Sequence, residues 1–217
     1  PVTVQQVGIS VIQLGGRMAY AVARILHDAG LLNGLHTDIH VAEKTALLMN
    51  RIGRVPGFAG LARFSGRYSG LPARLVSAHP ILGIAYALRL RFGRRGHDPR
   101  STFMWAGDRL ADYALRDGIG RSGTIYAYAS AAARVFKSVD ASQCHRILEQ
   151  PSAPVQFELE LADEERDKWP GLENMPGTRW VCECRERETL EWNLAHCIVC
   201  PSDFVREEAV RYGADPS

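Results

Sequence analysis

The stretch VGISVIQLGGRMAYAVARIL, residues 7–26, decides the first structural unit of the chain. Residues 7–14 form a nearly continuous apolar run, as expected of a strand that is buried on both faces. Gly15 and Gly16 interrupt this run. From Met18 onward, apolar residues fall at helical spacing until a glycine provides a stop signal. The stretch therefore predicts a strand, a tight glycine turn and a helix that begins at Met18.

Similar apolar runs alternate with amphipathic stretches along the rest of the chain. Such alternation is typical of a parallel sheet with helices on both faces. We therefore predict one α/β domain over residues 1–217, with a Rossmann-like, doubly wound and mostly parallel sheet. Residues 53–70 are rich in glycine and are expected to form a long loop. Further strands are predicted at residues 35–39, 123–128, 144–148 and 196–200, and further helices at residues 43–51, between Ser101 and Gly118, and at residues 131–137, 178–195 and 203–212.

The composition indicates a globular chain and excludes several other classes. Of the 217 residues, 46% are hydrophobic and 23% are charged, which excludes collagen, coiled coils and disordered proteins. No stretch approaches the ~18 uncharged apolar residues that a membrane span requires, and the start of the sequence lacks the features of a signal peptide. The five cysteines, all from Cys144 onward, do not resemble a disulfide framework. We expect a cytoplasmic protein.

Positive charge is concentrated in residues 51–100, which contain ten arginines and one aspartate. Residues 140–217, in contrast, contain 8 basic and 17 acidic residues. A planar guanidinium group binds phosphate and carboxylate groups in a bidentate manner, so the basic segment favours an anionic partner. The alternative is an ordinary solvated basic surface.

The segment ALRLRFGRR, residues 87–95, interleaves apolar side chains with Arg89, Arg91, Arg94 and Arg95. A segment of this kind fits the surface of an anionic membrane, as a peripheral contact. Its strict alternation, however, is not the pattern of an amphipathic helix. Nucleic acid is disfavoured as a partner because the last third of the chain is acidic and no nucleic-acid-binding motif occurs.

Gly15, Gly16 and Arg17 form a candidate anion site between the first predicted strand and helix. Free amides and the dipole at a helix start favour a phosphate, glycine allows the backbone to approach it closely, and an arginine adds a charge-assisted hydrogen bond. The dinucleotide fingerprint G-x-G-x-x-G is not met, because Arg17, Met18 and Ala19 follow the glycine pair. A tight turn without a ligand is the alternative.

Tyr126, Tyr128 and Ser130 lie at the carboxyl end of the strand predicted at residues 123–128. Open α/β sheets bind their ligands at this end of their strands, so Tyr128 and Ser130 are candidates for a binding site. Packing in the core is the alternative interpretation for the two tyrosines.

The cysteines and histidines indicate neither a metal site nor a catalytic site. Cys197 and Cys200 would point to opposite faces of a strand, and Cys182 and Cys184 would point in nearly opposite directions on a helix, which disfavours a shared zinc ion. None of the seven histidines has a carboxylate partner that the sequence can place beside it. Motifs of serine hydrolases, P-loop enzymes and zinc proteases do not occur.

The segment LAHCIVCPSDFVREEAVRYGA, residues 194–214, combines a strand, a turn at Pro201 and Ser202, and a helix that ends in glycine. Together with GGRMAYAVARIL at residues 15–26 and LEQPSAP at residues 148–154, it resembles the N-terminal half of GT-B glycosyltransferases of the family 4 type. That family includes relatives of sucrose and glycogen synthases and bacterial mannosyltransferases. There, this turn precedes the crossover into the C-terminal nucleotide-sugar domain. Residues 43–100 have no part in the resemblance.

The resemblance implies an enzyme with two Rossmann-like domains, of which this chain is the acceptor-side one. It implies that Gly15 and Gly16, with Arg17 beside them, approach the diphosphate of a nucleotide-sugar donor. It also implies retention of the anomeric configuration, with no metal ion or other cofactor. Tyr128, Ser130 and the four arginines of residues 87–95 would then face a glycan, lipid-linked or anionic acceptor, at the inner face of the membrane.

Two features depart from the family. The histidine that many members have after the strand corresponding to residues 123–128 is replaced here by Ala127, Ala129 and Ser130. The sequence also stops before the glutamate-containing donor motif, so we expect this chain to lack a C-terminal donor domain and to be inactive alone. Two alternatives stay open: a nicotinamide or flavin oxidoreductase on the same sheet, and a non-catalytic α/β module that binds an anionic partner.

Overall fold

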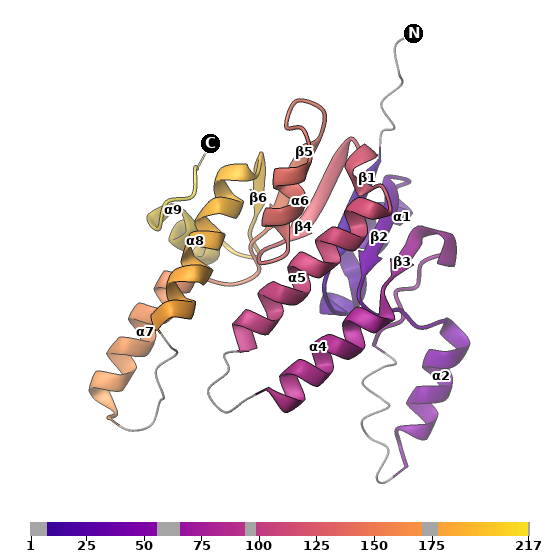
Figure 1. Ribbon diagram of the computed structural model, residues 1–217, viewed down its shortest axis with the longest axis horizontal. Helices are drawn as coiled ribbons and strands as arrows, with labels where there is room; N and C mark the ends of the chain where they lie inside the picture. Colours follow the sequence, from indigo (N-terminus) through magenta and orange to yellow (C-terminus); the bar gives the residue numbers. More distant parts are fainter. Residues whose placement is uncertain (1–7, 56–65, 94–98, 171–177, 217) are drawn as a thin grey trace.

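A computed structural model describes residues 8–55, 66–93, 99–170 and 178–216. These residues form a sheet of six parallel strands in the order β3-β2-β1-β4-β5-β6 (Figure 1). The order reverses between β1 and β4, which is the switch point of a doubly wound fold. The strands are β1 (Ile9–Gln13), β2 (Leu32–Thr37), β3 (Val76–Ala78), β4 (Thr124–Tyr128), β5 (His145–Glu149) and β6 (Cys197–Val199).

Helices cover both faces of this sheet, so the predicted Rossmann-like α/β class is confirmed. Helices α4, α5, α6 and α8 lie side by side over one face (Figure 1), and α1 packs on the other. Among the described helices, none is long and apolar enough to cross a membrane. The helices are α1 (Ala21–Asp28), α2 (Glu43–Ile52), α4 (Pro80–Phe92), α5 (Pro99–Arg116), α6 (Ala132–Ser138), α7 (Val155–Lys168), α8 (Thr178–Leu194) and α9 (Asp203–Arg211), with short 3-10 turns η1 (Arg17–Tyr20), η2 (Ala73–Leu75) and η3 (Ile119–Arg121).

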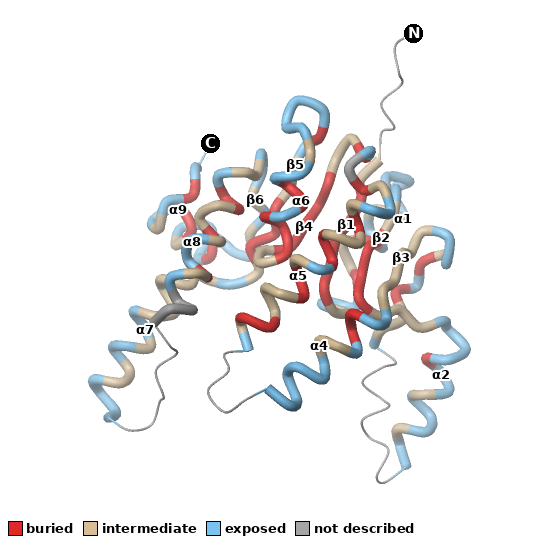
Figure 2. Tube along the Cα trace, in the orientation of Figure 1, coloured by how far each residue is buried: buried red, intermediate tan, exposed pale blue. Residues whose placement is uncertain are grey.

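Adjacent residues of the central strand belong to two different parts of the core. Ile12 packs with residues of α5, α6 and α8, whereas Val11 packs with α1 and with the ring of Tyr20. Both β1 residues are fully buried. Because side chains alternate across a strand, this arrangement explains why residues 7–14 are apolar without interruption. Figure 2 shows the buried central strands and the exposed outer ends of α2, α4 and α7.

The first helix does not begin at Met18, as the sequence predicted. Met18, Ala19 and Tyr20 have left-handed φ angles of 50°, 49° and 59°, and α1 starts only at Ala21. Two contacts hold this strained turn in place. The Gln13 side chain donates to the carbonyl oxygen of Arg17 at 2.8 Å, and the hydroxyl of buried Tyr20 donates to the carbonyl oxygen of Ile39 at 2.9 Å. Local periodicity contains no signal for either contact.

Two other predictions needed correction. The second strand lies at Leu32–Thr37 and not at residues 35–39, because the backbone leaves the sheet at Asp38. The alternating segment that includes Arg89 and Arg91 is the last part of helix α4, although its alternating pattern does not predict an amphipathic helix. Its apolar residues are exposed on more than one side of α4, which explains why they do not follow the helical period. Within the predicted loop at 53–70, residues 56–65 lie outside the described part.

Two carboxylates of α8, three residues apart, connect this helix to the segments that follow β4 and β5. Glu191, 1% exposed, accepts hydrogen bonds from the amides of Ser130 (2.7 Å), Ala132 (3.1 Å) and Ala133 (2.9 Å) at the start of α6. Glu188 accepts from the amide of Val155 at 3.0 Å, at the start of α7. Carboxylates at helix N-termini complement both the free amides and the helix dipole.

We predict that Glu191→Ala lowers the free energy of unfolding by about 3 kcal/mol, because it leaves three backbone amides and the Arg187 guanidinium without their buried partner. Chemical denaturation followed by circular dichroism measures the change. Glu186→Ala, at an exposed position of the same helix, is the matched control and should stay within about 0.5 kcal/mol of the wild type. Equal effects of the two substitutions would contradict this role of Glu191.

Candidate functional site

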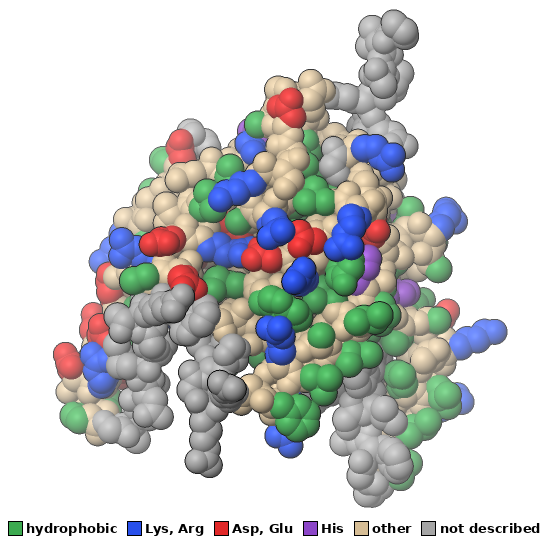
Figure 3. Space-filling model, in the orientation of Figure 1, with side chains coloured by type: hydrophobic (Ala, Val, Ile, Leu, Met, Phe, Trp, Pro, Cys, Tyr) green, Lys and Arg blue, Asp and Glu red, His purple; other side chains and the backbone are tan. Residues whose placement is uncertain are grey.

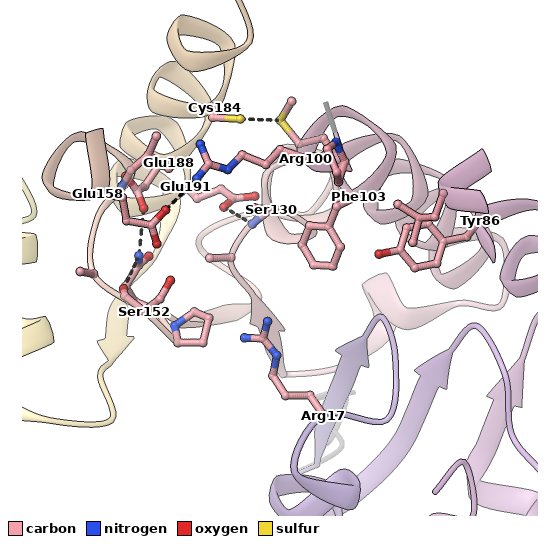
Figure 4. Close-up of a pocket in the computed structure, with 18 residues that line it drawn as sticks. Arg17, Tyr86, Arg100, Phe103, Ser130, Ser152, Glu158, Cys184, Glu188 and Glu191 are labelled. Carbon is pink, nitrogen blue, oxygen red and sulfur yellow. Dashed lines mark hydrogen bonds and ion pairs between the residues drawn. The ribbon is translucent and has the colours of Figure 1, made fainter. Parts of the chain in front are cut away.

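A cavity of about 380 Å³ lies beyond the carboxyl ends of β4 and β5 (Figure 4). This is the position at which open α/β sheets bind ligands. Residues from the β1–α1 turn, α4, α5, the segments after β4 and β5, and α8 surround it. Its lining consists of Arg17, Tyr86, Leu90, Pro99, Arg100, Phe103, Met104, Ala129, Ser130, Gln150, Pro151, Ser152, Ala153, Val155, Cys184, Glu158, Glu188 and Glu191.

Two arginines supply positive charge to this cavity. Figure 4 shows Arg17 reaching from the turn after β1 into the space between Phe103 and the loop that contains Ser152. Within the described residues, Arg17 makes no ion pair, and its guanidinium carbon lies 5.8 Å from the centre of the Tyr128 ring. Arg100 is paired with Glu158, with 3.0 Å between Nη2 and Oε2. The charge of Arg17 is therefore available to an anionic ligand.

An aromatic wall stands opposite the polar loops. Tyr86 of α4 and Phe103 of α5 pack with 6.4 Å between their ring centres, and Leu90 extends this apolar surface along α4. Burial raises the pKa of Tyr86, so its hydroxyl stays protonated near neutral pH. This wall suits the hydrophobic part of a ligand or the apolar face of a sugar ring.

The carboxylates in the floor of the cavity already have partners. Glu191 binds the start of α6, and Glu188 binds the start of α7 and the side-chain amide of Gln150 at 2.9 Å. Burial raises the pKa of both glutamates. These groups shape the floor, and they leave Arg17, Ser130 and the aromatic wall to contact a ligand. The arrangement fits an amphipathic molecule with an anionic group near Arg17.

The glycine junction is closely packed by other parts of the chain. The amide of Gly15 donates to Asp38 Oδ1 at 2.9 Å, and the Arg67 guanidinium binds the same oxygen at 2.9 Å. A Cβ atom on Gly16 would lie only 2.8 Å from the carbonyl oxygen of Gly66. The pair is thus required by this turn, since Gly15 has a φ angle of +83°. The Gly15 amide already has a carboxylate acceptor, which leaves Arg17 as the part of the junction that lines the cavity.

The structure brings together only some of the predicted site residues. Arg17 and Ser130 both line the cavity. Tyr128 does not, because its side chain lies in the core; its hydroxyl has no hydrogen bond within the described residues, and burial raises its pKa. Neighbouring Tyr126 donates to Glu149 Oε2 at 2.7 Å. Both tyrosines therefore pack in the core, which is the alternative interpretation that the sequence left open for them.

Arg89 and Arg91 lie on the outside of α4. The guanidinium carbon of Arg89 lies 3.8 Å from the centre of the Trp105 ring, and that of Arg91 lies 6.0 Å from the centre of the Phe92 ring. Neither side chain lines the cavity. Arg94 and Arg95 lie outside the described residues.

At the other end of the sheet, Pro201 and Ser202 form the turn between β6 and α9. Ser202 caps α9, since its hydroxyl accepts a hydrogen bond from the amide of Val205 at 3.3 Å. All five cysteines are free thiols.

Sequence reasoning missed much of the cavity, including Tyr86, Arg100, Phe103 and Glu158. Tyr86 and Arg100 lie in the arginine-rich segment, residues 51–100. Phe103 lies in the helix predicted between Ser101 and Gly118, and Glu158 lies in the acidic last third of the chain. Only their position beyond the ends of β4 and β5 marks them, and that position depends on how α4, α5 and α7 pack. Comparison of the chain with protein-family models, with curated proteins and with solved structures finds no match.

We predict that Asp38→Ala lowers the free energy of unfolding by about 3 kcal/mol. The Asp38 side chain is 1% exposed, and its loss leaves both the Gly15 amide and the Arg67 guanidinium without an acceptor. Asp28→Ala, which removes a side chain that is 82% exposed, is the control and should have almost no effect. Urea denaturation curves of the two variants provide the comparison, and a similar midpoint for both would argue against the role of Asp38.

Proposed function

We propose that this chain is the acceptor-binding half of a glycosyltransferase that moves a sugar from a nucleotide-diphosphate donor to a hydroxyl group of an anionic, lipid-linked acceptor. The observation that carries the proposal is the cavity at the carboxyl edge of the sheet, where Arg17, which has no ion-pair partner among the described residues, faces an aromatic wall. A nucleotide-sugar domain beyond residue 217 would supply the donor and complete the active site.

The strand order supports a nucleotide-dependent enzyme, because the cavity lies next to the switch point between β1 and β4. An oxidoreductase would use the same topology. It is disfavoured by the missing third glycine of the dinucleotide fingerprint. A melting assay separates the two classes: stabilisation by NAD but not by UDP or GDP would favour the oxidoreductase.

Arg17 would stabilise the leaving diphosphate. When the bond between the sugar and the diphosphate breaks, negative charge develops on the diphosphate, and a preorganised cation stabilises that charge. The acceptor hydroxyl oxygen then forms the new bond to the sugar, and its proton passes to an oxygen of the departing diphosphate. Ser130 and the loop around Ser152 would orient the acceptor, and transfer would retain the anomeric configuration without a metal ion.

The lipid part of the acceptor is inferred from the outer surface of α4. Five apolar residues of this helix are 45–79% exposed, and Figure 3 shows hydrophobic side chains gathered over α4 and α2. Arg89 and Arg91 belong to the same surface. Since Tyr86 and Leu90 of α4 line the cavity, a lipid held at this helix would have its head group at the cavity entrance. The exposed apolar residues of α4 are Ile81, Ile84, Leu88, Leu90 and Phe92.

We predict that Arg17→Ala lowers kcat/KM by about 100-fold in the complete gene product, with most of the loss in kcat, because the arginine acts on charge that develops in the transition state. Arg24→Ala, at an exposed position of α1 outside the cavity, is the control and should keep full activity. Steady-state kinetics with a range of nucleotide-sugar donors provides the test. An active Arg17→Ala enzyme, or a gene that encodes no second domain after Ser217, would contradict the proposal.

We also predict that the double substitution Arg89→Ala and Arg91→Ala weakens binding to anionic phosphatidylglycerol vesicles by about 30-fold, since each arginine near such a surface contributes about 1 kcal/mol. Sedimentation with vesicles measures the change. Arg206→Ala with Arg211→Ala removes the same charge from α9, where both side chains are about 60% exposed, and should leave binding unchanged. A non-catalytic module that binds a soluble anionic partner would show no vesicle binding at all.

A further inference from the structure

His36, His79 and Asp117 meet on the face of the sheet that α5 covers. His36 is on β2, His79 lies directly before α4, and Asp117 lies directly after α5. The amide of His79 donates to the carbonyl oxygen of Thr37 at 3.0 Å, which holds the two histidines next to each other. None of the three residues lines the cavity described above, so this cluster is separate from the proposed acceptor site.

The three side chains direct their donor atoms toward a common point. Asp117 Oδ2 lies 3.1 Å from His79 Nε2 and 3.7 Å from His36 Nδ1, and all three atoms lie within 4.8 Å of one another. An ion with tetrahedral coordination and bonds of about 2.0–2.1 Å requires about 3.4 Å between its ligand atoms. The two measured separations fall on either side of that value, so small side-chain rotations suffice to place one ion among the three atoms.

His36 Nδ1 and His79 Nε2 are buried, and neither atom has a hydrogen bond within the described residues. The side chain of His36 is 91% buried, given its 9% exposure, and it points at the carboxylate without the geometry of a hydrogen bond. A buried polar atom without a partner is rare and costly in a native protein.

The surroundings orient His79 and leave access for solvent. The ring of Tyr113 stacks on His79 with 4.5 Å between ring centres, and Tyr113 lies one helical turn before Asp117 on α5. A polar cavity of about 230 Å³ adjoins the cluster; its lining includes His36, Asp117, Ser77 and Ser122, together with Arg74 and Arg121. Asp117 is 34% exposed. An ion can therefore enter from this side, and water can occupy the coordination position that the protein leaves open.

We propose that His36 Nδ1, His79 Nε2 and Asp117 Oδ2 bind one divalent transition-metal ion, for which Zn²⁺ is the best match, and that water from the adjoining cavity completes its coordination. Two imidazoles and one carboxylate favour zinc over magnesium or calcium, which prefer oxygen ligands alone. The ion would connect β2, the start of α4 and the end of α5. It would thus hold in place the helix that carries the exposed apolar surface.

The test is calorimetric titration of Zn²⁺ into the metal-free 217-residue protein, with His79→Gln and Asp117→Asn as variants. We expect one ion per chain in the wild type, at least about 100-fold weaker binding in each variant, and a rise in Tm of about 5 °C or more at saturating zinc. His27→Gln is the matched control, since His27 also lies beside a carboxylate, at 3.4 Å from Asp28, but without a third ligand. It should bind zinc as the wild type does.

Cobalt substitution separates this site from adventitious binding to cysteine. The Co²⁺ spectrum should show tetrahedral ligand-field bands without a thiolate charge-transfer band. A thiolate band, zinc binding that survives both substitutions, or no binding by the wild type would overturn the proposal. Circular dichroism of the metal-free variants verifies their folding. If His79→Gln fails to fold, the partly exposed position of Asp117 makes Asp117→Asn the decisive variant.

Discussion

The buried carboxylate of Glu191 is the contact on which the proposed site most depends. It accepts hydrogen bonds from three backbone amides at the start of α6 and pairs with Arg187 on its own helix. It therefore joins α8, late in the chain, to the end of the central strand β4. Glu188, one helical turn earlier, does the same for the start of α7. These two contacts hold the segments that form the floor of the cavity against α8.

A comparable constraint acts on the opposite side of the cavity. Asp38 holds the Gly15 amide and the Arg67 guanidinium together, and the left-handed turn of residues 18–20 follows directly. The turn is strained, and its cost is offset by the buried ring of Tyr20. As a result, Arg17 points into the cavity, and it forms no ion pair with another described residue. Glu191 and Asp38 thus position the two sides between which a ligand would bind.

Helix α4 connects the two proposals. Its inner residues Tyr86 and Leu90 line the cavity, whereas most of its outer surface is apolar and basic. Its first turn begins directly after His79, a ligand of the proposed zinc site. An ion at the start of α4 would add a contact that links this helix to β2 and to the end of α5. The sequence alone could not predict the proposed metal site, because about forty positions separate each of its three residues from the next.

Sequence alone determined the fold class, the position of β1, the glycine turn and the cap of α9 at Ser202. These features depend on contacts between neighbours in the chain, which a periodic or turn pattern records. Two of the residues that line the cavity, Arg17 and Ser130, could also be chosen as candidates from the sequence, because the ends of parallel strands can be located from their apolar runs. Tertiary structure decided the rest. It placed Tyr128 in the core, moved the start of α1 to Ala21, assembled the aromatic wall, and brought His36, His79 and Asp117 together. Each of these outcomes depends on contacts between residues distant in the chain, and no local pattern encodes which distant partner will fill a given space.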